Sequence, residues 1–215
     1  MADVTKTRDG YWQRVEEIFH LALDMPADAR ADFVHERLAD YLKVVELTNA
    51  LIAIDPSKVS NLVIGSEAQG RVAKLLAAEG RMDQATQYAK SSIATLSQIA
   101  DRPDAAAQNL SEAAVVLMET PVPSLRDYAR ALRYAKRADE LSGGKEPGAI
   151  VYLAQAYANT GDPEKALATV HRGLALVAPP APGQKPSEVR QALEDLQRDI
   201  QILMKTGRLP AGFNH

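Results

Sequence analysis

The side chains that could carry out chemistry are scattered along this sequence. The four histidines do not form the i, i+4 pair by which a helix presents two metal ligands, and there is no cysteine. Neighbouring carboxylates such as Asp139-Glu140 point to different sides of a helix, so they do not converge on one substrate. The glycines of Gly143-Gly144-Lys145 lack the upstream glycine of a phosphate-binding loop. We therefore expect a protein that is not an enzyme and that has no metal and no cofactor.

Composition and charge narrow the possible partners. The chain has 215 residues, of which 46% are hydrophobic and 25% charged, and this is enough for one sizeable domain. A net charge of −3 argues against a nucleic-acid partner, because a row of phosphates needs a row of cations. No apolar run approaches the roughly 18 residues of a membrane span, and the N-terminus has no signal-peptide core. Together with the lack of cysteine, these features favour a cytoplasmic protein without membrane contact.

The elements that position any site are predicted to be helices, and the clearest stretch is Pro147–Leu176. Apolar residues recur there at helical spacing on both sides of Gly161. Gly161 can adopt the left-handed conformation that ends a helix. Asp162 can cap the next helix, and Pro163 at its first position loses no hydrogen bond. The pattern predicts a helical hairpin.

This hairpin resembles the tetratricopeptide repeat (TPR). The signature positions of that family are a leucine, a small residue, a tyrosine, a glycine and a second small residue. They are filled here by Leu153, Ala154, Tyr157, Gly161 and Ala166. Ile150 stands in place of the opening aromatic residue. The resemblance implies an all-α fold in which TPR-like hairpins form a right-handed superhelical stack, because one hairpin cannot bury both of its apolar faces alone.

Further hairpins can be recognised upstream. A tyrosine and a lysine two residues later recur at Tyr41–Lys43, Tyr88–Lys90 and Tyr134–Lys136, which lie 47 and 46 residues apart. This period is longer than the usual ~34 residues, so we expect lengthened helices or loops. The turn Gly80–Ala85 also aligns with Gly161–Ala166. We predict TPR-like repeats over residues 39–177.

Two helix starts can be predicted inside this region. Asp55 is expected to cap a helix that begins at Pro56 and runs to Ala78. Ser124, with Asp127 three residues later, has the spacing of a capping arrangement and predicts a helix from Leu125 to Leu141. Gly70 weakens the first of these helices, and it could let a neighbouring helix or a ligand approach the backbone closely.

Residues 11–38 are predicted to be a pair of helices, with Trp12 on the apolar face of the first and a second helix from about Ala27. The pattern Trp-x-x-Val-x-x-Ile-Phe-x-x-Ala-Leu resembles the segment before the catalytic domain of certain bacterial serine/threonine kinases. No glycine-rich loop and no His-Arg-Asp triplet follows it. The resemblance implies a regulatory or docking region without the catalytic domain. A shift in apolar phase between Leu38 and Tyr41 predicts a kink or a join, and the alternative is an ordinary helical start to the stack.

The two ends of the chain complete the predicted organisation. Residues 1–10 are expected to be flexible, residues 178–186 to form a proline-rich spacer, and residues 207–215 to form a tail. A helix is predicted over residues 187–206, with an apolar stripe made of Val189, Leu193, Leu196, Ile200 and Leu203. Such a helix suits the end of a repeat array, which needs a cap with a polar outer face. The same stripe could instead form the seam of a homodimer.

The TPR resemblance also implies where a partner would bind. In such a stack the first helix of each hairpin lines a concave groove, and its non-packing residues contact a peptide. The corresponding residues here are Arg71, Lys74, Ser111, Val115, Val151, Gln155 and Asn159. A basic end and an amide-bearing end suit a peptide with an acidic segment. Gly70 and Val151 stand where the family's chaperone-binding clamp would need a donor, so that use is not expected. We predict a non-enzymatic scaffold that binds a protein or peptide, with the kinase docking region as the alternative.

Overall fold

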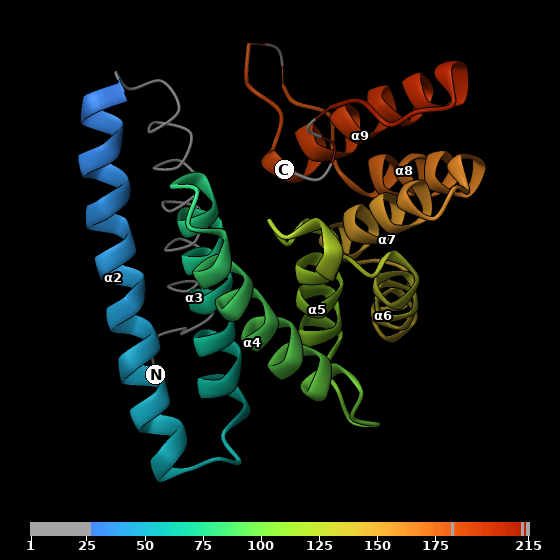
Figure 1. The fold of residues 1–215 in the computed structure, drawn as a ribbon. Helices are drawn as coiled ribbons and strands as arrows, with labels where there is room; N and C mark the ends of the chain where they lie inside the picture. The colour runs from blue at the N-terminus through green and yellow to red at the C-terminus, as the bar shows by residue number, and fades with distance from the viewer. Residues whose placement is uncertain (1–26, 182, 212, 214–215) are drawn as a thin grey trace.

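The computed structural model describes the backbone of residues 27–181, 183–211 and 213, and the side chains of these residues from Arg37 onward. Every regular element in this part of the chain is helical (Figure 1), which confirms the predicted all-α class. The elements are Ala27–Ile54 (α2), Val59–Ala78 (α3), Met82–Ala100 (α4), Ala107–Glu119 (α5), the 3-10 turn Pro123–Leu125 (η1), Tyr128–Leu141 (α6), Pro147–Asn159 (α7), Pro163–Leu176 (α8) and Glu188–Thr206 (α9).

Each helix packs against the helix that follows it in the chain. α3 packs against α4, α5 against α6 and α7 against α8, and we treat these pairs as three hairpins, the second of which is connected through η1. We call α3, α5 and α7 the first helices, and α4, α6 and α8 the second helices. α5 also contacts α7, and α7 contacts α9. In Figure 1, α2 and α9 lie at opposite ends of the array.

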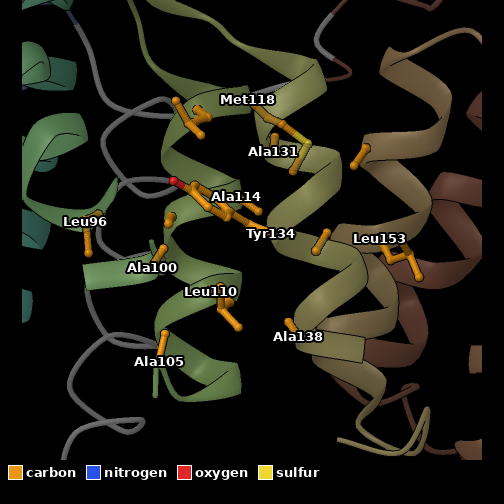
Figure 2. Packing of buried hydrophobic residues seen from close by; sticks show 14 residues of the cluster. Leu96, Ala100, Ala105, Leu110, Ala114, Met118, Ala131, Tyr134, Ala138 and Leu153 are labelled. Carbon is orange, nitrogen blue, oxygen red and sulfur yellow. The ribbon is translucent and has the colours of Figure 1, made fainter. Parts of the chain in front are cut away.

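The hydrophobic core is divided along the chain in the same way. One cluster contains residues of α2, α3 and α4. A second contains residues of α4, α5, α6 and α7, and a third contains residues of α7, α8 and α9. Many of the buried residues are alanines, which allow neighbouring helices to approach closely. Figure 2 shows the second cluster, where Ala131 and Ala138 of α6 lie beside the buried side chains of α5. Each helix is therefore buried mainly by its neighbours in the chain.

The turn at Gly161 matches its prediction. Gly161 has a φ of 80°, in the left-handed region that glycine tolerates. α8 begins after Asp162, whose side chain accepts a hydrogen bond of 3.2 Å from the backbone N–H of Lys165. Gly80 lies in the turn between α3 and α4 and has a φ of 75°. The two glycine turns predicted from the sequence are confirmed.

Both predicted helix starts are wrong by about one turn. α3 begins at Val59, because the Asp55 side chain accepts bonds from the N–H and the hydroxyl of Ser57 and so closes a separate turn. α6 begins after Asp127, which accepts a hydrogen bond of 2.9 Å from the N–H of Arg130. Asp127 is thus the cap, and Ser124 lies in η1. At both places an aspartate could serve either a turn or a helix, and its sequence position alone does not decide between them.

Helix α2 continues through the boundary predicted between residues 38 and 39. Leu38 and Tyr41 are both buried and belong to the same core cluster with α3. There is no helix end at the point where a kink or join was predicted. The predicted first helix with Trp12, and the expected flexible residues 1–10, lie outside the described residues.

Two glycines differ in how closely another helix approaches them. A Cβ at Gly70 would meet Ser92 Oγ at 3.4 Å, so Gly70 does not mark the tight approach that the sequence suggested. A Cβ at Gly173 of α8 would lie 2.8 Å from Leu193 Cδ2 and 2.9 Å from Ile150 Cγ2. Gly173 therefore lets α8 pack closely against α7 and α9.

Three arginines bond the C-terminal ends of the second helices. Arg137 of α6 donates to Ala100 O, at the last residue of α4, at 3.0 Å, and to Arg102 O and Pro103 O just after it, at 2.9 and 2.6 Å. Arg172 of α8 donates to Gly144 O after α6, at 3.3 Å. Arg190 of α9 donates to Val177 O after α8, at 2.7 Å. The last carbonyls of a helix have no partner within the helix, and a cation also suits their partial negative charge. The bonds therefore repeat from hairpin to hairpin.

The C-terminal helix α9 begins after Ser187 and ends at Thr206, before the left-handed Gly207, close to the predicted bounds. It packs against α7 and α8 through its apolar stripe. Leu193 and Ile200 are completely buried, and Leu196 is 8% exposed. These three side chains are covered within the chain, in the cluster that α9 forms with α7 and α8.

Candidate functional site

One carboxylate joins the first helices of all three hairpins. Lys74 Nζ of α3 lies 3.2 Å from Glu119 Oε2 at the end of α5. Gln155 Nε2 of α7 donates to the other oxygen, Glu119 Oε1, at 3.4 Å. Residues far apart in sequence thus meet at one point. We call Lys74, Glu119 and Gln155 the Glu119 cluster.

Asn159 extends this cluster along α7. Its Nδ2 donates to Gln155 O at 3.0 Å and to Met118 Sδ at 3.9 Å. Met118 precedes Glu119 at the end of α5 and is completely buried. Asn159 therefore supports the place where α5 and α7 meet, in addition to any contact with a partner.

The seven predicted peptide-contact residues differ in exposure. Ser111 and Gln155 are buried, with 8% and 6% of their surface exposed. The other five are partly exposed, namely Arg71, Lys74, Val115, Val151 and Asn159. A partner that approached this surface would meet these five first.

The structure brings Lys74, Gln155 and Asn159 together around the ends of α5 and α7. Ser111 and Val115 lie two turns and one turn before Glu119 on α5, and Val151 lies one turn before Gln155 on α7. The residues are thus arranged in two stripes at i, i+4 and i+8, one on α5 and one on α7.

Glu119 is the residue that the sequence prediction missed. It follows Val115 by four residues, so extending the predicted stripe on α5 by one turn would have included it. Glu119 also changes the expected charge of this surface. The charge of Lys74, expected to make this end of the surface basic, is balanced by a carboxylate 3.2 Å away.

A second polar cluster lies between α4 and α6. The Tyr134 hydroxyl donates to Asp101 Oδ1 at 2.5 Å, and Arg130 donates to Asp101 Oδ2 at 2.7 Å and to the Tyr134 oxygen at 2.8 Å. The bond from Tyr134, together with Arg130, holds the pKa of Asp101 below its ordinary value. Burial, with the bond to Asp101, raises the pKa of Tyr134. The three side chains are hydrogen-bonded to one another, and such a network suits a fixed contact between α6 and the end of α4.

Two features of the described residues bear on the kind of site. Among the side chains that the structure describes, no group of three or more His, Asp or Glu residues is placed to hold a metal ion. Within the described ranges, every helix is too short or too polar to cross a membrane.

No model of a known protein family matches the chain, and no curated protein and no solved structure matches it. The function is therefore inferred from the chain's own fold and side chains.

Proposed function

We propose that this protein is a non-enzymatic scaffold of the cytoplasm that binds a protein or peptide along its first helices. The hairpins would form a right-handed superhelical stack of the TPR kind. The Glu119 cluster is the observation that supports this proposal most directly, since it ties α3, α5 and α7 at one point. Helices joined in this way present their outer residues as one surface, as binding to an extended partner requires.

Helix α9 is proposed to cap the stack. Its apolar face packs against α7 and α8, while Gln191, Arg198 and Gln201 on its other side are exposed. A polar outer face stops a further hairpin from docking at that end.

The proposed surface would recognise a peptide by several modest contacts. Val115 and Val151 offer partly exposed apolar contacts. Arg71 and Lys74 would supply donors to peptide carbonyl groups at the α3 end. Recognition shared among three helices would tolerate small changes at any one position.

A peptide-selection experiment tests this function. The full chain is immobilised and used to select binders from a random-peptide display library, and the affinity of each selected peptide is then measured by fluorescence anisotropy. Arg71→Glu/Lys74→Glu should weaken binding at least about tenfold, because both donors are reversed in charge. Lys90→Glu, an exposed residue of the second helix α4, is the matched control. If no peptide is selected, or if the control and the double variant bind alike, the proposal is wrong.

The second candidate function is a docking region of a bacterial serine/threonine kinase signalling protein that self-associates. Exposed apolar residues on α2 favour it, because Leu47, Leu51 and Ile54 are 53%, 47% and 82% exposed at i, i+4 and i+7. Sedimentation velocity of the full chain should then show a mass near twice 23.3 kDa that falls when Leu51 is changed to Asp. A monomer at every concentration would rule out self-association through α2.

A further inference from the structure

The two side chains that bond Glu119 are ones that the sequence predicts to contact a ligand. Lys74 and Gln155 were assigned to peptide contact by the TPR resemblance, yet both bond the carboxylate of Glu119. The side chains of Lys74 and Glu119 are 37% and 21% exposed, so solvent and a partner can reach the pair. An internal carboxylate therefore occupies the place that an acidic ligand side chain would take.

We propose that Glu119 determines the charge specificity of this surface by excluding acidic ligand side chains from its centre. The inference rests on the proposed function, and it identifies the partner as a peptide segment that is neutral where it passes the Glu119 cluster. An aspartate or glutamate placed beside Lys74 would also lie beside Glu119. Like charges at such a distance repel, and the incoming carboxylate would have to displace an existing pair.

The neighbouring side chains fit a neutral segment. Val115 lies one turn before Glu119 on α5, and Val151 lies one turn before Gln155 on α7, and both are partly exposed. An apolar side chain of the ligand could contact either valine. Asn159 follows Gln155 by one turn, and its amide already bonds Gln155 O and Met118 Sδ within the chain. Acidic residues in the partner would therefore bind away from the centre of the surface, if at all.

The test compares peptides selected by five forms of the full chain from one random-peptide display library. The forms are the native protein, Glu119→Gln, Glu119→Ala, Glu119→Gln/Lys74→Met and the control Glu140→Gln, which changes an exposed carboxylate of α6. Glutamine keeps the shape of Glu119 and removes its charge. Circular dichroism and thermal melting establish that each form folds, and Glu119→Ala serves as a second neutral form.

The native protein should select peptides that are poor in Asp and Glu. Glu119→Gln should enrich for acidic peptides and should bind them about tenfold more tightly than the native protein does. Adding Lys74→Met to Glu119→Gln should remove that gain, because Lys74 is the cation that Glu119 pairs with in the native protein. Glu140→Gln should select the same peptides as the native protein.

The outcomes separate this inference from the proposed function. If the native protein selects peptides through the first helices but Glu119→Gln and Glu119→Ala leave their acidic content unchanged, the specificity role is wrong and the scaffold function stands. If a gain for acidic peptides persists with Lys74→Met, the role assigned to the pair is wrong. If no form selects any peptide, both proposals fail.

Discussion

Lys74 and Glu119 are 45 residues apart in sequence, and their side chains meet at 3.2 Å. The pair links the first helix of one hairpin to the first helix of the next. Gln155 adds the third hairpin through the same carboxylate. This contact gives the proposed binding surface both its continuity and its charge balance.

Gly173→Ala should destabilise the protein by about 1–3 kcal/mol. Alanine normally stabilises the interior of a helix by up to about 1 kcal/mol relative to glycine. Here the new Cβ would lie 2.8 Å from Leu193 and 2.9 Å from Ile150, so overpacking should outweigh the helix preference. Urea unfolding measures the change. Gly70→Ala is the control, because its Cβ meets only an ordinary contact, and it should be neutral or stabilising. Equal effects at the two glycines would contradict the close packing of α8.

Arg172→Ala should cost about 1 kcal/mol of unfolding free energy. The change removes both contacts of the guanidinium with Asp139, at 2.9 Å, and the bond to Gly144 O. The Asp139 side chain is only 16% exposed, whereas in the Arg198–Asp195 pair the side chains are 65% and 47% exposed. Arg198→Ala should therefore change stability by less than about 0.5 kcal/mol. Thermal and urea unfolding of both variants would reveal whether Arg172 joins α8 to α6 as described.

Tyr134→Phe should lower stability at neutral pH by about 1 kcal/mol, because the hydroxyl bond to Asp101 is lost. That bond is the main cause of the lowered pKa of Asp101. A carboxyl whose pKa is lower in the folded state contributes stability above its unfolded pKa and loses it as the pH falls toward its folded pKa. The difference between the native protein and Tyr134→Phe should thus shrink below about pH 4. Unfolding curves over a pH series provide the check, and a constant difference at all pH values would contradict the assignment.

Ile200→Ala should cost about 2–5 kcal/mol, since Ile200 is completely buried between α9 and its neighbours. Ile202→Ala, at a residue that is 36% exposed, should cost much less. If α9 packs within its own chain, neither unfolding midpoint should depend on protein concentration. A midpoint that rises with concentration would point instead to a stripe shared between two copies.

Local features of the fold could be predicted because short segments determine them. Gly161 and Asp162 act within one turn, and the helices on either side follow from apolar spacing. Asp55 and Asp127 were misassigned because a turn and a helix compete for the same carboxylate. The kink expected near Leu38 does not interrupt α2, because Leu38 and Tyr41 both face one core cluster.

The binding surface was predicted less completely, for a physical reason. The TPR resemblance identified residues on the first helices, but it said nothing about which of them pair with each other. Glu119 pairs with Lys74 only because the fold brings the end of α5 within reach of the Lys74 side chain of α3. Ser111 was expected on the surface and is 8% exposed, since neighbouring helices cover it. Long-range contacts of this kind depend on how the hairpins pack.

Amide hydrogen exchange of the full chain, with and without a peptide selected by it, tests the central claim most directly. Binding along the first helices should slow exchange in α3, α5 and α7, with the largest change near the ends of α5 and α7. The second helices α4 and α6 should change little. Protection confined to the second helices or to α2, with none in α5 and α7, would contradict the account.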